Sequence, residues 1–473
     1  ESLSETISDG IGRVTNERER MQASLDQVQS RIRERLRATL EALNPYWLTR
    51  TVTHLSQDIR TQESRKFIAG SRVYLRSIKR QMQSSVVRLM YRKSEGVVFA
   101  RRFKEFTTER RSGVETIIAL VESVSPGSGV LTGLPFYYRQ LFLSKQPIRQ
   151  DLWIRRPNER QRAEQAHQRY KQGYRGGILV SGDANAGKTT LCRRLAESWY
   201  SSQKVVHLFA PESGSTDPVQ FKTRLEEAVR THGDYDEIFH TIPAGGALVI
   251  HDLELWWERS PNGMVVIDIL MSLINTYSDR VLFLVNTNPY SFRFINTIKP
   301  IEQVFLGRVD CEPFDVEDLQ QAVLRRHRSA GLSYELGGKA EQDLTDFTLA
   351  RLFTGLFDLS SGNIGDGLQA WISCIEKVDG DRVSIHPPSR PVIDPLTQMD
   401  WEWMVWMQQF VLHKHLTEER LVRIFRSGTD DIRTQCHALR RAGLIRELQP
   451  GIMEINTYVR PFVVQALREM ELL

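Results

Sequence analysis

The chain has 473 residues, 41% of them hydrophobic and 26% charged, with a mild net charge of +5, so we expect about three globular domains of roughly 100–200 residues each. Its four cysteines lie far apart and form no CxxC pair, which argues against a zinc site or a disulfide framework and favours a reducing compartment. No run of about 18 apolar residues and no signal peptide is visible, so we expect no helix that spans a membrane.

Residues 1–124 are predicted to form a helical region. Apolar residues recur three, four or seven positions apart along 11–43 and again in a helical stretch at 51–92, which places them on one stripe of each helix. Pro45 ends the first helix because proline cannot continue the backbone ladder. We expect the two helices to form a hairpin or coiled coil, with a third helix near 98–123.

The same region is strongly basic. Residues 60–111 contain fifteen lysines and arginines and four glutamates, which gives this segment a net charge of +11 (15 − 4). Such a surface attracts the phosphates of DNA or of an anionic membrane, and a solvated helical face is the alternative interpretation.

A domain boundary is expected at Ser125-Pro126-Gly127, because Pro and Gly interrupt regular structure. Residues 125–150 then form a connector in this interpretation. A charged helix at about 157–172 leads into the next domain.

The most specific motif of the chain follows that helix. An apolar strand at 177–181 runs into GDANAGKTT and then into a helical sequence, the strand–loop–helix order of a P-loop. Its glycines let backbone N–H groups face the phosphates, and the following helix adds its positive end. Lys188 is expected to reach the β- and γ-phosphates, and the Thr189 hydroxyl to bind Mg²⁺. We therefore expect ATP to be bound by Gly182, Asp183, Ala184, Asn185, Ala186, Gly187, Lys188, Thr189 and Thr190.

A second magnesium ligand is expected where the buried strand at 247–250 ends, because ligands bind at the carboxyl ends of parallel strands. If Asp252 is the magnesium-side acid, Glu254 positions the attacking water. If the acid pair lies one place earlier, His251 takes the magnesium position and Asp252 the water position. Asp252 has a role in either register.

A third apolar strand, at 280–285, ends in Asn286-Thr287-Asn288-Pro289. An amide at this place can contact the γ-phosphate, and we expect Asn288 rather than Asn286 to do so; an ordinary Asn-Pro turn is the alternative. The predicted catalytic residues are Lys188, Asp252, Glu254 and Asn288, and the predicted metal ligands are Thr189 and Asp252.

These features together resemble the AAA+ superfamily and the neighbouring STAND switch ATPases. The resemblance covers roughly residues 150–380 and includes a motif at 154–159 that is similar to the family's Gly-Arg-x-x-Glu. It implies a P-loop core at 151–310 and a helical lid at 311–385. The first helix of that lid begins near Asp315, and its last helix begins near Asn363.

The chain departs from the family at three places. Arg155 stands where glycine is usual, and Asp366-Gly367-Leu368 stands where many lids carry an arginine that contacts the γ-phosphate. No trans-acting arginine finger is evident, although Arg293 and Arg308 are candidates. The resemblance therefore implies a slow switch rather than a fast motor.

After a proline-rich linker, residues 399–473 predict three helices, a hairpin around Gln449-Pro450-Gly451 and a closing helix, an order that looks like a winged helix. Arginines on its third helix, Arg433, Arg440 and Arg441, are placed to contact DNA phosphates. Acids on or near the same surface, Asp430, Asp431, Glu447 and Glu454, would oppose a phosphate backbone. We favour an internal packing module that clamps the nucleotide domain.

The predicted fold class is multidomain α plus α/β, with an N-terminal helical hairpin or coiled coil, a P-loop parallel-sheet core, a helical lid and a winged helix. The predicted function is an ATP- and Mg²⁺-dependent molecular switch with slow ATPase activity that forms homo-oligomers and acts on a protein effector. The alternatives are a DNA-loading ATPase similar to the origin-recognition group, and a membrane-associated scaffold with little turnover. We expect a cytoplasmic location, with peripheral membrane association or an anchor in an upstream segment as further options.

Overall fold

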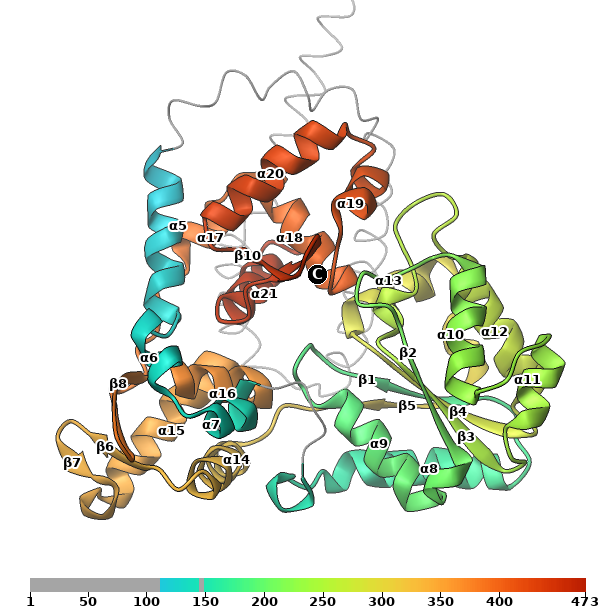
Figure 1. Ribbon diagram of the computed structural model, residues 1–473, viewed down its shortest axis with the longest axis horizontal. Coiled ribbons are helices and arrows are strands. Elements are labelled where there is room, and N and C mark those ends of the chain that lie inside the picture. The colour runs from blue at the N-terminus through green and yellow to red at the C-terminus, as the bar shows by residue number, and fades with distance from the viewer. Residues whose placement is uncertain (1–110, 144–148) are drawn as a thin grey trace, which may run out of the picture. The chain divides into compact units, whose positions relative to one another are not determined.

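The computed structural model describes residues 111–143 and 149–473, all within one compact unit of residues 96–473. The helices predicted at 11–43 and 51–92 lie outside the described residues, and so does nearly all of the basic segment. Figure 1 shows the described elements, from α5 (Arg111–Val124) to α21 (Arg460–Glu469).

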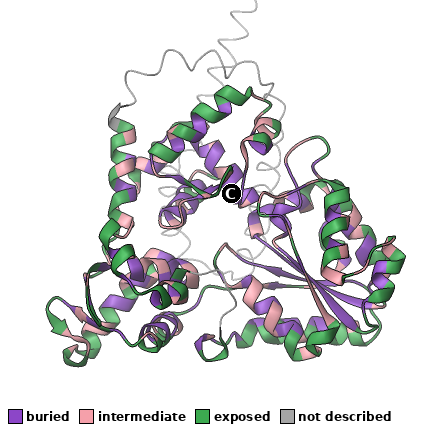
Figure 2. Cartoon of the chain, in the orientation of Figure 1, coloured by how far each residue is buried: buried purple, intermediate pink, exposed green. Residues whose placement is uncertain are grey.

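The predicted parallel sheet is present, with five strands in the order β2-β3-β4-β1-β5 and parallel pairing throughout. Every residue of β1, β3 and β4 is buried, as expected for strands with helices on both faces (Figure 2). The strands are β1 Gly177–Ser181, β2 Val205–Phe209, β3 Gly246–His251, β4 Val281–Thr287 and β5 Phe305–Asp310. The flanking helices are α8 Pro157–Lys171, α9 Lys188–Trp199, α10 Pro218–Val229, α11 Tyr235–Thr241, α12 Val265–Tyr277 and α13 Pro289–Ile298.

This topology decides where the site lies. The three central strands β3, β4 and β1 are parallel neighbours, so their carboxyl ends meet at one edge of the sheet. The P-loop follows β1, Asp252 follows β3 and Asn288 follows β4. The segments predicted to bind nucleotide are therefore brought to the same edge.

The lid contains a small sheet that the sequence analysis did not predict. Its helices are α14 Val316–Ser329, α15 Asp346–Ser360 and α16 Ile364–Ser373. Four strands pair in the order β7-β6-β9-β8, namely β6 Ser333–Leu336, β7 Lys339–Ala340, β8 Ile375–Asp379 and β9 Arg382–Ile385. Strands of two to five residues are too short to show alternation in the sequence, so the prediction of a purely helical lid was incomplete.

The predicted connector at 125–150 is also more structured than expected, with α6 (Ser128–Gly133) and α7 (Phe136–Leu143). Tyr138 of α7 is fully buried, accepts a hydrogen bond from Trp371 Nε1 at 2.7 Å and lies 3.0 Å from His327 Nδ1. Both partners belong to lid helices. This part of the connector therefore belongs to the core of the lid.

One helical stretch among the described residues, Gly113–Gly133, is long and apolar enough to cross a membrane, by length and composition alone. It has 21 residues and a mean hydropathy of 1.3, which differs from the expectation that no such stretch exists. Within it α5 ends at Val124, before residues 125–127, and Ile117, Leu120 and Val121 are buried in the hydrophobic core.

The C-terminal region has the predicted order of three helices, a hairpin and a closing helix. These are α18 Trp401–His413, α19 Glu418–Phe425, α20 Thr429–Arg441, β10 Ile445–Gln449, β11 Ile452–Ile455 and α21, preceded by the short α17 Asp394–Thr397. In α18, Trp403 and Trp406 are buried, and Trp406 stacks on Phe425 with ring centroids 4.5 Å apart. These two tryptophans are thus part of a hydrophobic core.

Candidate nucleotide site

The P-loop joins β1 to α9 in the predicted way. Gly187 has φ +90°, a left-handed conformation that favours glycine, and α9 begins at the next residue, Lys188. Lys188 is buried, and its ammonium group donates to the carbonyl oxygen of Asp183 at 3.0 Å. Lys188 therefore folds back onto its own loop, and its contact with the β- and γ-phosphates stays a prediction.

The rear of the P-loop is held by Arg156, from the motif before the core. Its guanidinium donates to the carbonyl oxygen of Ala186 at 2.9 Å and lies over the ring of Phe314, 4.0 Å from the centroid. It also pairs with Glu159, three residues later, at 2.5 Å. Arg156 was not among the predicted site residues, although its Arg-x-x-Glu spacing was the signal that could have identified it.

Asp252 follows β3 in a left-handed conformation, with φ +53° and ψ +59°. Its backbone N–H donates to Asn286 Oδ1 at 3.0 Å, which ties the turn to the neighbouring strand β4. Burial acts to raise the pKa of Asp252, but the ammonium groups of Lys414 and Lys188 outweigh it and hold the pKa below its usual range. Asp252 is therefore a carboxylate at neutral pH.

His251 has both ring nitrogens occupied. Asn286 Nδ2, which can only donate, lies 2.7 Å from Nδ1, so the ring proton is on Nε2, which lies 3.1 Å from His207 Nδ1. Burial lowers the pKa of His251 to about 3, which keeps the ring neutral. His251 is therefore neutral and engaged at both nitrogens, and the choice between the two registers of the acid pair stays a prediction.

The predicted metal ligands suit Mg²⁺, which prefers oxygen donors such as a hydroxyl and a carboxylate. Thr189 lies in the first turn of α9 and Asp252 follows β3, so both are at the same edge of the sheet. Thr189 and Asp252 would hold the ion. Its chemistry there would be to neutralise charge on the β- and γ-phosphates.

Glu254 and Asn288 lie beside each other. Glu254 is buried, which raises the pKa of its carboxyl group, and its Oε2 accepts a hydrogen bond from the backbone N–H of Asn288 at 3.1 Å. The Asn288 side chain caps α13 and donates to the carbonyl oxygens of Val411 and Leu412 at 3.1 and 3.4 Å. Water positioning by Glu254 and γ-phosphate sensing by Asn288 stay predictions.

The lid touches the P-loop directly through the start of α16. Asn363 Nδ2 donates to the carbonyl oxygen of Ala184 at 2.8 Å. The backbone N–H of Gly365 donates to the carbonyl oxygen of Asn185 at 3.2 Å, which is a main-chain hydrogen bond between the lid and the loop. A Cβ at position 365 would lie 2.4 Å from the Asn185 side chain, so its absence is what allows this close approach.

The C-terminal helix α21 also reaches the P-loop, which no local pattern indicated. Arg460 is paired with the carboxylate of Asp183, and its other terminal nitrogen lies 3.8 Å from Asp366 Oδ2. Arg468 lies 3.5 Å from the second oxygen of Asp183, and the hydroxyl of Tyr290 donates to that same oxygen at 3.3 Å. Asp183 therefore links the predicted phosphate loop to the C-terminal domain.

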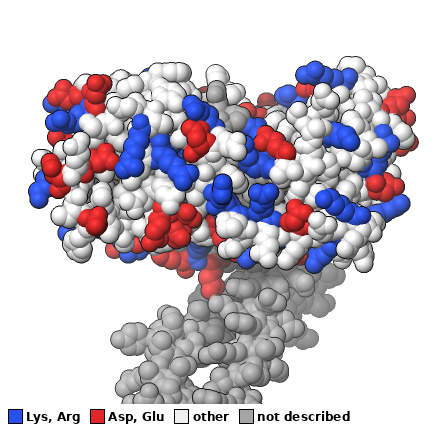
Figure 3. Space-filling model, turned by 90° about the horizontal axis from the view of Figure 1, so that it is seen from below, with Lys and Arg blue, Asp and Glu red and all other residues white. Residues whose placement is uncertain are grey.

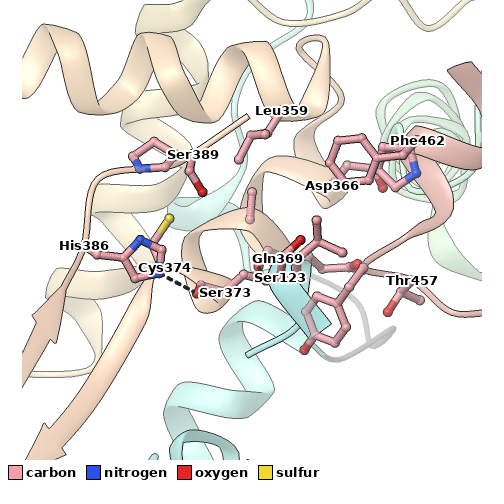
Figure 4. Close-up of a pocket in the computed structure, with 15 residues that line it drawn as sticks. Ser123, Leu359, Asp366, Gln369, Ser373, Cys374, His386, Ser389, Thr457 and Phe462 are labelled. Atoms are coloured by element: carbon pink, nitrogen blue, oxygen red, sulfur yellow. Dashed lines mark hydrogen bonds between the residues drawn. The ribbon is translucent and has the colours of Figure 1, made fainter. Parts of the chain in front are cut away.

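Asp366 lies on the wall of a small cavity, together with Ser123, Gln369, Tyr458 and other residues of α5, the lid and the C-terminal domain (Figure 4). Its Oδ1 accepts a hydrogen bond from Asn185 Nδ2 at 3.2 Å. Burial raises the pKa of Asp366 to about 7, against the opposing effect of Arg460. The stretch Asp366-Gly367-Leu368, where the AAA+ resemblance implies an arginine, thus contains a buried acid with a pKa near neutral.

This pKa predicts a pH-dependent stability difference for Asp366→Asn. A raised native pKa means that the native state binds the proton more tightly than the unfolded state, so wild-type stability is lost as pH rises from about 4 to about 7. Relative to Asp366→Asn, the wild type should lose on the order of 4 kcal/mol over this window. Urea unfolding of both proteins at pH 4.5, 6 and 8 measures the difference, and parallel pH profiles would contradict the assignment.

No family model matches the sequence, and neither does any curated protein. Among solved structures, the chain is similar to the Aeropyrum pernix ORC2 protein in ADPNP–ADP complexes, with 11% identity, a TM-score of 0.38, and coverage of 70% of this chain and 98% of that one. It is also similar to the Aeropyrum pernix ORC1 protein in complex with DNA, with 16% identity, a TM-score of 0.38, and coverage of 71% and 97%. It is similar, too, to the Thermotoga maritima RuvB Holliday junction branch migration motor, with 14% identity, a TM-score of 0.35, and coverage of 71% of this chain and 98% of that one.

The fold is evident from the elements of this chain. The sheet order β2-β3-β4-β1-β5, the P-loop between β1 and α9, and the lid that follows β5 are the arrangement of the P-loop AAA+ fold. The predicted fold class is thereby confirmed for the described residues.

Proposed function

We propose that this chain is an ATP-dependent molecular switch of the AAA+/STAND type, whose nucleotide state controls its conformation and self-assembly. The observation that carries the proposal is the set of contacts on the P-loop itself. The lid holds Ala184 and Asn185, while α21 of the C-terminal domain holds Asp183. A ligand bound in this loop would therefore lie against contacts made by both domains.

The electrostatics give this coupling a direction. ATP phosphates are negative, so they would repel the carboxylate of Asp183 and compete with it for Arg460 and Arg468, which would break the pairs that hold α21 on the loop. A ligand shifts a conformational equilibrium only by its difference in affinity for the two states. Nucleotide that binds more tightly when α21 has moved would therefore drive the C-terminal domain away from the loop.

Hydrolysis would reset the switch. Lys188 would hold the β- and γ-phosphates, and Asp252 or Glu254 would position the attacking water. Arg460 of α21 is paired with the carboxylate of Asp183, so in this arrangement it does not take the place of the lid arginine that the AAA+ resemblance implies. We therefore expect ATP hydrolysis to be slow.

The DNA-loading alternative receives less support from the third helix of the C-terminal domain. Arg440 lies 2.9 Å from Glu447, and Arg433 lies 3.5 Å from Glu418, so acids offset both arginines. Figure 3 shows the side of the molecule away from α20, and basic and acidic side chains are interspersed there as well. Salt-dependent DNA binding that is lost in Arg440→Ala plus Arg441→Ala would reverse this preference.

The membrane-scaffold alternative rests on residues 1–124, most of them outside the described residues.

The switch is tested by its oligomeric mass, measured by light scattering with and without a non-hydrolysable ATP analogue and Mg²⁺. We expect the wild type to gain mass with the analogue and Lys188→Ala to stay unchanged. Arg460→Ala should assemble at a lower analogue concentration, because α21 has lost a contact with Asp183. Arg441→Ala, an exposed arginine on α20, is the matched control. A wild-type mass that ignores the analogue would reject the switch and favour the scaffold.

A further inference from the structure

A further cation of the C-terminal domain, Lys414, pairs with Asp252, the predicted magnesium ligand. Lys414 follows α18, and its ammonium group is 2.9 Å from Asp252 Oδ2. Both side chains are largely buried, with 27% and 20% of their surfaces exposed. The pair therefore joins a residue outside the nucleotide core to the acid that would hold Mg²⁺.

The backbone of Lys414 is strained where it presents this charge. Its φ and ψ are +64° and −60°, a combination that a non-glycine residue rarely adopts. The N–H of His415 donates to the carbonyl oxygen of His413 at 2.7 Å, which completes a γ-turn of the rare type with positive φ. Strain of this kind persists only where the surroundings enforce it, and it is concentrated at functional sites.

The surroundings do enforce it. The ring of His413 is buried against Trp257, with centroids 4.4 Å apart, and His415 Nδ1 lies 3.0 Å from the carbonyl oxygen of Glu212. One step earlier in the chain, the carbonyl oxygens of Val411 and Leu412 accept from the amide of Asn288. Segment 411–414 thus contacts both the predicted magnesium ligand, Asp252, and the predicted γ-phosphate sensor, Asn288.

We propose that the ammonium group of Lys414 takes the place beside Asp252 where Mg²⁺ would bind. Segment 411–414 must then withdraw before Mg²⁺ reaches Asp252 and the γ-phosphate reaches Asn288. This inference rests on the proposed nucleotide switch and names its regulation. Lys414 acts as a positioning residue: it offsets the charge of Asp252 while the C-terminal domain is docked, and it competes with Mg²⁺ for the same carboxylate.

The competition is measured by binding of a fluorescent ATP analogue while Mg²⁺ is titrated. In Lys414→Met, which keeps a side chain of similar length without charge, the Mg²⁺ concentration for half-maximal binding should fall by about tenfold, the factor that one close charge pair contributes. Lys414→Arg retains the charge and should stay near the wild type. Lys299→Met removes an exposed lysine that pairs with Asp268 and should change nothing.

Withdrawal of the segment has its own readout. Trp257 contacts His413, so movement of 411–414 should increase solvent access to the indole. We expect acrylamide quenching of tryptophan fluorescence to rise when Mg²⁺ and the analogue are added to the wild type, and to be elevated already in unliganded Lys414→Met. Because the unliganded protein is measured as well, quenching tests the position of segment 411–414 in Lys414→Met even if this variant binds nucleotide with altered affinity.

The outcomes separate the inference from the proposed function. If the wild type binds the analogue and Lys414→Met needs as much Mg²⁺ as the wild type, the role of Lys414 is rejected while the switch stands. If the analogue binds only after Lys414 is replaced, the lysine blocks the site completely and the inference is supported. If no variant binds the analogue at any Mg²⁺ concentration, both proposals fail.

Discussion

Replacing Lys188 with alanine is expected to lower the affinity for MgATP by about 100-fold, the upper part of the range for hydrogen bonds that involve a charged group. The P-loop offers backbone N–H groups to the phosphates, but Lys188 is the side chain of the loop that adds a full positive charge. The lysine is buried and donates to the carbonyl oxygen of Asp183 in the described arrangement. Isothermal titration with ATP and Mg²⁺ measures the loss.

The matched control for this change is Lys222→Ala on α10. Lys222 is partly exposed and lies 3.6 Å from Glu226, so its removal takes away one surface ion pair and no predicted phosphate contact. Its affinity for ATP should equal that of the wild type. An affinity of Lys188→Ala within twofold of the wild type would place the nucleotide elsewhere.

Replacing Glu258 with glutamine is expected to destabilise the docked C-terminal domain by about 3–5 kcal/mol, the cost of leaving a buried charge without its partner. The carboxylate of Glu258 is fully buried and lies 3.3 Å from Arg420 and 2.8 Å from Arg423, both on α19. Arg420 is itself buried and donates to the carbonyl oxygen of Trp257 at 2.8 Å. Glutamine retains the shape but not the charge, so Arg420 loses its only carboxylate partner among the described contacts.

Urea unfolding followed by tryptophan fluorescence measures this loss. Glu447→Gln is the control, because Glu447 pairs with Arg440 at a site where both side chains are about one-third exposed or more. Exposed pairs contribute about 0–1 kcal/mol, so this variant should be close to the wild type. Equal stabilities for the two variants would show that the Glu258 cluster does not hold the domains together.

The local segments of the core could be predicted because each carries its own signal. β1, the P-loop and α9 follow one another without a break, and the motif needs no distant partner to form. The apolar strands before Asp252 and Asn288 are likewise continuous, and parallel strands in one sheet bring their ends together. The small sheet of the lid was missed because its strands have only two to five residues each.

By itself, the sequence determined a P-loop motif between a strand and a helix, an acidic strand end, and a lid segment that has Asp366-Gly367-Leu368 where the AAA+ resemblance implies an arginine. Only the tertiary structure decided which distant charges meet these groups. Arg460 pairs with Asp183 from 277 residues away, and Lys414 reaches Asp252 from the far end of α18. The physical reason is that a motif encodes its own backbone geometry, whereas the partner of a buried charge depends on how whole domains pack, which no local spacing records.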